Sequence, residues 1–351
     1  MTLKASFEIA GRTLALDGSC FVIAEAGSNH NRDLHTALAL IDVAAEAGAD
    51  CVKFQVFEAK RLYPKGAGRS DYLGDKRSIY DIIQALEMPQ EWLGKLAERA
   101  RSHALAFIAS PFHEEAVALL DPYVDAFKIA SYELTHLPLL QEVARRGKPV
   151  IMSTGASHLA EVAVSVTALA EAGCEKLALM QCTAAYPTPP GSVNVRSLVT
   201  MRERFQIPVG LSDHSEDPVV APMTAAALGA ACLEKHFTLS KRLPGPDHAF
   251  AIEPDGLRAL VDAVRKVQVV RGSGDKDVQG VEQELRHFAR RSIFTTRGIA
   301  AGESFTRDNV DVLRNGKLEQ GLEPARLAGV LTRKAARAIP AERALTEADL
   351  A

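Results

Sequence analysis

The chain has 351 residues, 47% of them hydrophobic and only 6% aromatic. This length suggests about two domains, or one α/β barrel of about 250 residues with an addition, and an aliphatic composition is typical of buried parallel strands. The 41 Lys and Arg residues nearly balance the 44 Asp and Glu residues, which leaves a net charge of -3. That balance argues against a nucleic-acid-binding protein, which normally carries a basic face.

The cysteines and the apolar segments indicate a protein of the cytoplasm. The five cysteines form no C-x-x-C pair, which in a chain of this length is typical of reduced thiols. Cys51, Cys182 and Cys232 lie on predicted strands and are expected to be small core residues. No signal-peptide core follows Met1, and the longest apolar stretch, 219–233, is shorter than the roughly 18 residues of a membrane helix. We therefore expect a cytoplasmic protein without a membrane segment.

Short aliphatic runs alternate with longer amphipathic segments along most of the chain. A hairpin is predicted over 3–18, followed by eight strands at 21–26, 50–57, 105–110, 126–130, 149–153, 176–182, 207–211 and 232–237. Helices are predicted after them at 34–47, 90–102, 114–120, 137–146, 159–172, 195–204, 219–228 and 255–270. Eight strands, each followed by a helix, predict an α/β fold of the (β/α)8 TIM-barrel type. The alternative is an open doubly wound sheet, which the lack of a Gly-rich phosphate fingerprint after the first strand disfavours.

Two parts of the chain fall outside this repeat. Residues 58–88 form a long insertion after the second strand, and in a barrel such an insertion lies at the catalytic end. After a stretch rich in Gly and charge, the residues from about 290 onward contain short strand-like pieces and turns. We therefore predict a barrel domain over 1–271, a linker over 272–289 and a small, mostly β domain over 290–351.

The polar residues that end the predicted strands are the candidates for chemistry, because TIM-barrel active sites lie at the carboxyl ends of the strands. In chain order they are Glu25, Lys53, Gln55, Ser110, Lys128, Ser131, Glu133, Thr183, Tyr186, Ser212, His214, Glu234 and His236. A lysine within an aliphatic strand is costly to bury unless it meets an anion. One such lysine could belong to a structural ion pair. Two of them, with serines at matching strand ends, favour a phosphate or carboxylate site.

Two histidines, His214 and His236, end adjacent predicted strands. Two imidazoles at this place could share one divalent metal, with waters and substrate as the other ligands. A structural, hydrogen-bonded role for each ring is the alternative. The residues alone thus predict a barrel enzyme for a small anionic, phosphorylated substrate, with a divalent metal as one option.

Several segments, taken in this order, resemble the sialic acid synthase family. They include IAEAGSNHN (23–31), AGADCVKFQVF (47–57), FKIASYEL (127–134), QCTAAYPTP (181–189), GLSDHS (210–215), LEKHFT (233–238) and PGPDHAF (244–250). The tail, 290–314, resembles the antifreeze-like (SAF) domain of those enzymes. The resemblance implies condensation of phosphoenolpyruvate with an N-acetylated hexose, such as N-acetylmannosamine, to give a nonulosonic acid and phosphate for surface polysaccharides. The segment KIASYEL is more typical of relatives that make pseudaminic- or legionaminic-type acids or spore-coat sugars.

The resemblance also implies roles for individual residues. It implies Mn²⁺ or Mg²⁺ held by His214 and His236, with Glu25 and Glu133 beside the sugar and its aldehyde. It implies that phosphoenolpyruvate is held by Lys53, Gln55, Ser110, Lys128, Ser131 and Ser212, and that Tyr186 and Asp247 contact the sugar. In the family's homodimer the antifreeze-like domain covers the other barrel, which implies contacts from Phe288 of the partner subunit and Arg314 of the partner subunit.

Four positions depart from the family pattern. Arg32 replaces a glycine, Gly74 or Asp75 stands where an asparagine occurs, and Asn315 follows Arg314 where a proline is usual. These three departures leave the identity of the acceptor sugar undetermined. The fourth, Ala184, replaces an asparagine that contacts phosphate, and it predicts weaker binding of phosphoenolpyruvate.

Two other functions remain as alternatives. One is a barrel synthase that joins phosphoenolpyruvate to a sugar phosphate, which the antifreeze-like tail disfavours. The other is a non-catalytic sugar-binding relative, which the intact Glu25, Lys53, Lys128, His214 and His236 disfavour.

Overall fold

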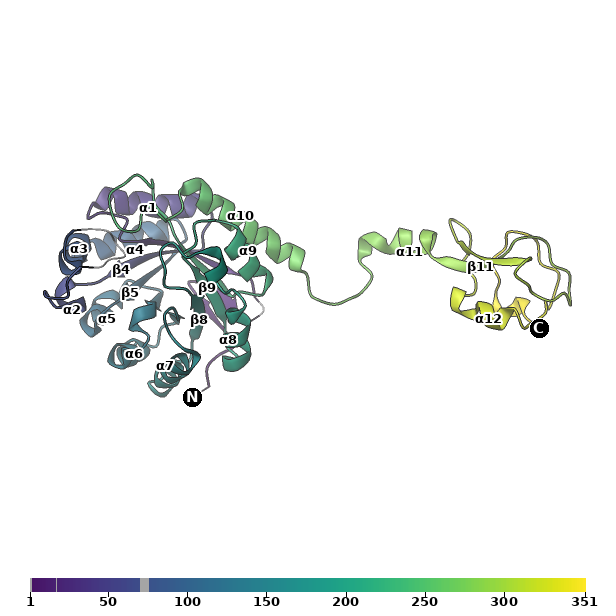
Figure 1. Cartoon of the computed structure of the whole chain (residues 1–351), viewed down its shortest axis with the longest axis horizontal. Coiled ribbons are helices and arrows are strands. Elements are labelled where there is room, and N and C mark those ends of the chain that lie inside the picture. Colours follow the sequence, from purple (N-terminus) through teal and green to yellow (C-terminus); the bar gives the residue numbers. More distant parts are fainter. Residues whose placement is uncertain (1, 17, 70–75) are drawn as a thin grey trace. The chain divides into compact units, whose positions relative to one another are not determined.

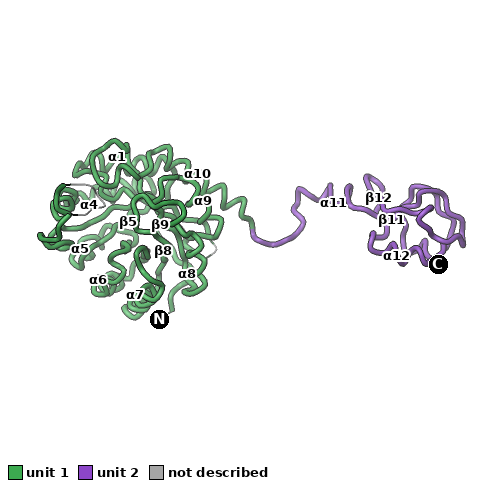
Figure 2. Tube along the Cα trace, viewed as in Figure 1, with its two compact units in different colours: residues 1–272 green, residues 273–351 purple. Residues whose placement is uncertain are grey.

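The computed structural model describes residues 2–16, 18–69 and 76–351 and contains two compact units, residues 1–272 and 273–351 (Figures 1 and 2). Gly74 and Asp75, where a family asparagine was expected, lie outside the described residues. Each unit has its own hydrophobic core.

Unit 1 is built around a closed parallel barrel, which confirms the predicted fold class. Within the described ranges its strand order is β10-β3-β4-β5-β6-β7-β8-β9. The strands are β3 (Phe21–Gly27), β4 (Cys51–Val56), β5 (Ala106–Pro111), β6 (Ala126–Ile129), β7 (Val150–Ser153), β8 (Leu177–Cys182), β9 (Val209–Asp213) and β10 (Cys232–His236). The aliphatic runs form these strands because the residues are buried on both faces.

Helices surround the barrel on its outer side (Figure 1). They are α1 (Leu34–Glu46), α4 (Leu93–Ser102), α5 (Glu114–Leu120), α6 (Leu137–Ala144), α7 (Leu159–Glu171), α8 (Ser197–Phe205), α9 (Val220–Ala227) and α10 (Pro254–Arg271). The 58–88 insertion adds the short helices α2 (Ala59–Leu62) and α3 (Ile79–Leu86). Among the described residues, no helix combines the length and the apolarity that spanning a bilayer requires.

The N-terminal hairpin closes one end of the barrel. Strands β1 (Ser6–Ile9) and β2 (Arg12–Ala15) pair antiparallel, and Phe7, Ile9 and Leu14 from them join the inward-facing core residues Ile23 and Ile108. Apolar side chains therefore fill the amino-terminal half of the barrel. The polar residues at the carboxyl ends of the strands lie at the opposite end.

Gly210 on β9 lies where only a glycine fits, because a Cβ atom there would come within 2.1 Å of the Cys232 carbonyl oxygen on β10. We expect Gly210→Ala to lower the free energy of unfolding by about 3 kcal/mol or more, since the contact is with backbone. Urea unfolding followed by circular dichroism measures this. Gly191→Ala is the matched control, because a Cβ atom at that position meets nothing within 4 Å. Equal stability of the two variants would contradict the close approach.

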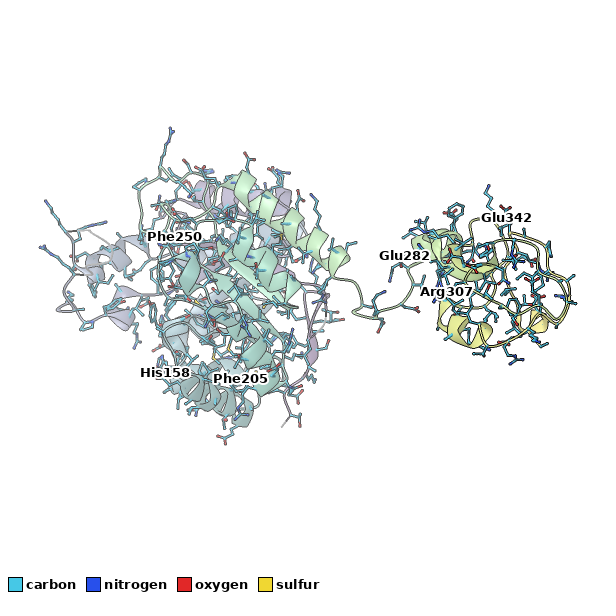
Figure 3. All side chains as sticks on the ribbon, turned by 45° about the vertical axis from the view of Figure 1, so that its right-hand side comes forward. His158, Phe205, Phe250, Glu282, Arg307 and Glu342 are labelled. Atoms are coloured by element: carbon cyan, nitrogen blue, oxygen red, sulfur yellow. The ribbon has the colours of Figure 1, made fainter. Side chains whose placement is uncertain are left out.

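Unit 2 is a small domain with an antiparallel strand pair, β11 (Arg291–Thr295) and β12 (Val310–Arg314). Its core contains Ile293, Ile299 and Phe305, whereas charged side chains such as Arg307 and Glu342 lie at its surface (Figure 3). Two short helices complete it, α11 (Gln283–Ala289) and α12 (Leu327–Val330). Helix α11 falls within the segment predicted as a linker.

Candidate active site

Two buried lysines lie at the carboxyl end of the barrel. The Nζ atoms of Lys53 on β4 and Lys128 on β6 lie 3.7 Å and 3.1 Å from the same atom, Oε1 of Glu234 on β10. Lys53 Nζ also lies 2.8 Å from Oε1 of Glu25 on β3. The structure thus brings the two predicted lysines together and surrounds them with two carboxylates.

Burial and charge act in opposite directions on these groups. Burial alone would lower the pKa of Lys53, but the carboxylates of Glu234 and Glu25 hold it above its ordinary value. Burial would raise the pKa of Glu234, but Lys128 and Lys53 hold it below its ordinary value. Burial raises the pKa of Glu25. The site therefore keeps at least one buried ammonium and one buried carboxylate charged at neutral pH.

Several polar atoms around the lysines have no hydrogen-bond partner. Gln55 Nε2 donates to Glu25 Oε1 over 2.6 Å, and Ser212 Oγ donates to Glu234 Oε1 over 3.2 Å. Among the described groups, however, Ser110 Oγ and the Oε2 atoms of Glu25 and Glu234 are buried without a partner. Unpaired buried polar atoms are rare in native proteins and indicate a place where a ligand or water binds. Ser131 contributes differently: its Oγ accepts the Gly155 backbone N–H over 3.0 Å.

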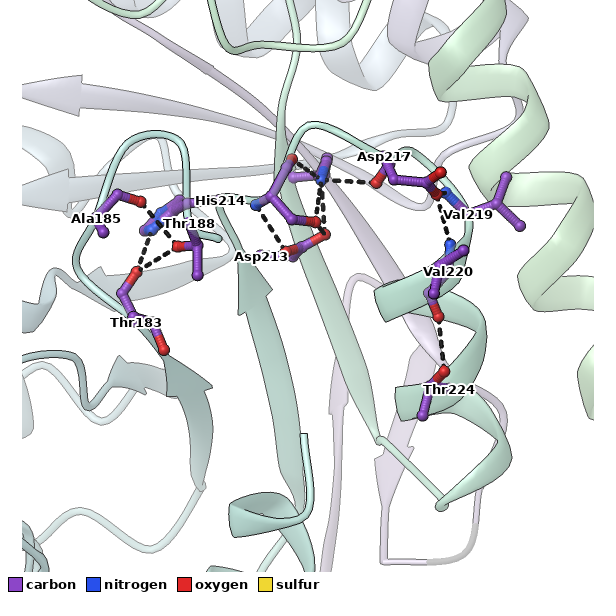
Figure 4. Close-up of polar contacts among 11 residues, drawn as sticks. Thr183, Ala185, Thr188, Asp213, His214, Asp217, Val219, Val220 and Thr224 are labelled. Carbon is purple, nitrogen blue, oxygen red and sulfur yellow. Dashed lines mark hydrogen bonds and ion pairs between the residues drawn. The ribbon is translucent and has the colours of Figure 1, made fainter. Parts of the chain in front are cut away.

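The rings of His214 and His236 lie next to each other, with 5.3 Å between their centroids and 64° between their planes. Nδ1 of His214 lies 3.0 Å from the carbonyl oxygen of Thr183, as Figure 4 shows. A carbonyl only accepts, so Nδ1 carries a proton, and in the neutral ring Nε2 keeps its lone pair. His236 Nδ1 is buried without a hydrogen-bond partner, and burial together with the nearby cations lowers the pKa of this ring. His236 is therefore a neutral imidazole at physiological pH.

The two rings fit a divalent metal. Neutral imidazoles are common ligands of such ions, and a hydrogen bond from the second ring nitrogen fixes which nitrogen binds. In the described part of the chain, no group of three or more His, Cys, Asp or Glu side chains could hold a metal ion. Water and substrate would therefore supply the remaining ligands.

Aromatic and acidic residues form the wall beside the histidines. The Tyr186 ring lies 4.1 Å from the His214 ring and 5.3 Å from the Phe250 ring, measured between centroids. Asp247 Oδ2 lies 3.6 Å from His236 Nδ1, and burial followed by the charge of Glu25 raises the pKa of Asp247 to about 6. Tyr186 and Asp247 thus lie beside the same two histidines.

Glu133 sits in a one-turn helix after β6, and its Oε2 is buried without a partner. Burial raises the pKa of this carboxyl group from 4.5 to about 7. Between these two values the folded protein binds more protons than the unfolded one, so stability falls as the pH rises through this window and is level above it.

We expect Glu133→Gln to remove this pH dependence. Relative to the wild type, the variant's free energy of unfolding should rise by about 3 kcal/mol between about pH 4 and pH 8, since one pKa unit corresponds to about 1.4 kcal/mol. Urea titrations at a series of pH values measure it. Glu98→Gln, on the exposed face of α4, is the control. Parallel pH profiles of wild type and Glu133→Gln would contradict the raised pKa.

Glu234 was a candidate because it ends a predicted strand, but the family resemblance gave it no role, and Cys182 and Phe250 were not among the candidates. Glu234 lies two residues before His236 on one strand, so strand alternation already placed both on one face. Cys182 is buried, as expected, but it also lies beside the site, because its Sγ is 3.8 Å from His214 Nδ1. Cys51 and Cys232 do belong to the inner core of the barrel. Phe250 ends the family-like segment PGPDHAF (244–250), but the resemblance gave it no role.

Phe288 and Arg314 lie in unit 2, on two segments that are next to each other. The Gly316 backbone N–H donates to the Phe288 carbonyl oxygen over 2.9 Å, and Arg314 pairs with Arg291 across β11 and β12. Both side chains are exposed. Unit 2 therefore presents an aromatic ring and a guanidinium group from neighbouring segments.

Two of the departures from the family pattern have a visible structural consequence. Arg32 adopts a left-handed φ of 54°, a conformation that glycine adopts at no steric cost. Ala184, together with Cys182 and Thr183, lines a groove of about 1260 Å³ that continues between α7 and α8. Ala184 thus presents only a methyl group to this groove.

A parallel barrel with buried lysines and paired histidines at the carboxyl ends of its strands, followed by a small β domain, is the arrangement of a barrel enzyme for an anionic substrate. Residues 40–276 match the model of the NeuB family, and residues 290–351 match the SAF domain. The chain is 42% identical to the spore coat polysaccharide biosynthesis protein SpsE of Bacillus subtilis, over 99% of this chain and 97% of the relative. The chain belongs to the NeuB family and carries a C-terminal SAF domain.

Two further relatives and two solved structures agree with this assignment. The chain is 36% identical to the N,N'-diacetyllegionaminic acid synthase of Legionella pneumophila, covering 89% of each chain. It is 35% identical to a pseudaminic acid synthase of Campylobacter jejuni, covering 95% of this chain and 97% of the relative. The crystal structure of B. subtilis SpsE matches with a TM-score of 0.67 over 99% of each chain at 40% identity. A putative spore coat protein E from Chromobacterium violaceum matches with a TM-score of 0.76 at 28% identity, over 94% of this chain and 99% of that one.

Proposed function

We propose that the protein is a nonulosonic acid synthase, which condenses phosphoenolpyruvate with an N-acetylated hexose and releases phosphate. One observation carries the proposal: two buried lysines and two adjacent histidines lie at the carboxyl end of the barrel. The names of the relatives that make legionaminic and pseudaminic acids support this class of product. The name of the SpsE relative supports a role in surface polysaccharide biosynthesis.

The lysines and hydroxyl groups would bind phosphoenolpyruvate. Lys53 and Lys128 supply two ammonium groups for the phosphate and carboxylate of the substrate, and Ser110, Ser131 and Ser212 supply hydroxyl groups. In the reaction, C3 of phosphoenolpyruvate forms a bond to the sugar aldehyde carbon, water adds at C2, and the C2–O bond to phosphate breaks. The ammonium groups stabilise the phosphate as it leaves.

The histidines and carboxyl groups would act on the sugar. His214 and His236 would hold Mn²⁺ or Mg²⁺, and when bound the ion supplies Lewis-acid polarisation of the aldehyde oxygen. Glu133, with a pKa of about 7, can hold or release a proton at neutral pH. Glu25, Tyr186 and Asp247 would orient the acceptor.

Phosphate release tests this function. Phosphoenolpyruvate is supplied with N-acetylmannosamine or with 2,4-diacetamido hexoses, with and without Mn²⁺, and product is identified by mass spectrometry. We expect metal-dependent phosphate release with at least one acetamido hexose. Release with none of them would overturn the proposal, and turnover only of arabinose 5-phosphate or erythrose 4-phosphate would replace it with a sugar-phosphate synthase.

We also propose the homodimer that the family resemblance implies, and mixing two inactive variants tests it. If unit 2 of one subunit completes the site of the other, Arg314→Ala and His214→Ala should each be nearly inactive, and mixed dimers should regain part of the activity because one site is intact. Activity is measured after mild dissociation and reassociation. Each variant treated alone is the control. Failure of the mixture to gain activity, with mixed dimers demonstrated by mass spectrometry, would contradict the shared site.

A further inference from the structure

Lys235 lies between Glu234 and His236 on β10, but its side chain points to the opposite side of the strand. In the pairing of β10 with β9, Glu234 lies opposite Ser212 and Lys235 lies opposite Asp213. Side chains alternate along a strand, so the first pair faces the barrel interior and the second faces the helices. The Lys235 ammonium is buried, with Nζ 2.6 Å from Asp213 Oδ2.

The same ammonium group holds the turn that follows β9. Lys235 Nζ donates to the backbone oxygen of Ser215, to Ser215 Oγ over 3.3 Å and to the backbone oxygen of Asp217 over 3.1 Å. Asp213 in turn accepts from the Ser215 backbone N–H over 2.9 Å and from Ser215 Oγ over 3.0 Å. One buried cation thus connects the end of β10 to three residues of the turn 213–217.

The turn is also fixed to the start of α9. Asp217 Oδ1 accepts the backbone N–H groups of Val219 and Val220, each over 2.7 Å. Figure 4 shows Asp213, Asp217 and Val220 within this set of polar contacts. The turn therefore has little freedom as long as Lys235 is in place.

His214 lies inside this turn and is held on its other side by the loop after β8. Its Nδ1 lies 3.0 Å from the Thr183 carbonyl oxygen, and its own carbonyl accepts the Thr188 backbone N–H over 2.9 Å. His236 follows Lys235 directly on β10. Lys235 therefore contacts the turn that carries His214 and is also joined to His236 by a peptide bond.

We propose that Lys235 is a positioning residue for the two imidazoles, and this inference rests on the metal site proposed above. It acts on His214 through the turn 213–217 and on His236 through the adjoining peptide of β10. The competing view is that Lys235 and Asp213 only balance each other's charge. Apolar residues can often replace a buried ion pair without loss of stability, but no apolar side chain can donate to the carbonyls of Ser215 and Asp217.

The test compares Lys235→Met with the double variant Lys235→Met/Asp213→Asn. The single variant leaves a buried carboxylate unpaired, so it should lose both stability and Mn²⁺ affinity. The double variant has no unpaired charge, so its melting temperature should recover. If Lys235 positions the rings, the Mn²⁺ affinity of the double variant, measured by calorimetry, should stay at least about tenfold weaker than that of the wild type, as is typical for groups that orient metal ligands.

A second measurement needs no metal. The tautomer of His214 is read from long-range ¹H–¹⁵N spectra of the metal-free protein at mildly alkaline pH. We expect the wild type to show the Nδ1-protonated form and the double variant to show a mixture. Mn²⁺ affinity within about twofold of the wild type together with one unchanged tautomer would overturn the inference.

Two controls distinguish a failure of this inference from a failure of the proposed metal site. Lys148→Met removes another ammonium that donates to backbone carbonyls, those of Asp121 and Val124, and it should lower stability without changing Mn²⁺ affinity. A wild-type protein that binds no Mn²⁺ would refute the proposed metal site. The tautomer measurement alone would then decide whether Lys235 positions His214.

Discussion

His236→Ala should abolish metal binding and activity together. The wild-type ring is buried, with an unpartnered Nδ1 atom and the His214 ring 5.3 Å away. Removing one of two imidazoles should weaken Mn²⁺ binding at least about 100-fold. Activity should fall at least about a thousandfold, because a bound metal supplies several kcal/mol of transition-state stabilisation. Calorimetry with Mn²⁺ and the phosphate-release assay measure the two losses.

His103→Ala is the control for this experiment. His103 is a partly exposed histidine after α4 that pairs with Asp42 on the outside of the barrel. It should change neither Mn²⁺ affinity nor activity. If His236→Ala retained wild-type Mn²⁺ affinity, the two-histidine metal site would be wrong. If it lost the metal but kept its activity, the metal would have no part in the reaction.

Glu234→Ala should cost about 3–5 kcal/mol of stability. Its Oε1 atom is shared by Lys53, Lys128 and Ser212, and removing the carboxylate leaves buried ammonium groups without one of their counter-charges. An anion that binds between the lysines of the variant should replace the missing carboxylate as their counter-charge. Inorganic phosphate and phosphoenolpyruvate should therefore raise the melting temperature of the variant more than that of the wild type.

Glu142→Ala provides the matched comparison. Glu142 also pairs with two cations, Arg145 and Arg146, but near the protein surface, and its loss should cost less than about 1 kcal/mol. Equal costs of the two substitutions, or no preferential rescue of Glu234→Ala by phosphate, would show that the buried lysines do not form an anion site.

The ends of the strands show how accurately sequence patterns predict the bounds of an element. The aliphatic run predicted a strand over 207–211, whereas β9 covers Val209–Asp213. The strand continues through Ser212 and Asp213 because they pair with Glu234 and Lys235 of β10. A polar residue interrupts the aliphatic sequence pattern that predicts a strand. The strand itself continues when the neighbouring strand pairs with that residue and offers its side chain a polar partner.

The residues of the site could likewise be predicted only in part from sequence patterns. Lys53, Lys128, His214 and His236 could be selected from the sequence, because charged residues at the ends of aliphatic strands are unusual. The position of Glu234 between the two lysines could not be selected in this way. It depends on closure of the barrel, which brings the side chain from β10 within reach of those from β4 and β6.

The sequence by itself determined the succession of strands and helices, the small C-terminal domain and most of the polar residues at the strand ends. A repeated aliphatic pattern and a set of family motifs are local properties, so one chain without a structure suffices to find them. The net charge of -3 likewise argued against a nucleic-acid-binding protein, although it said nothing about the charges inside the barrel.

Only the tertiary structure decided which of these residues meet. Lys128 and Glu234 are 106 positions apart and lie 3.1 Å from each other, and the buried Cys182 also lies beside His214. The outward pair of Lys235 and Asp213 is visible only once β9 and β10 are in register. Such contacts depend on the closure and register of the barrel, because a shift of one residue would turn every inward side chain outward.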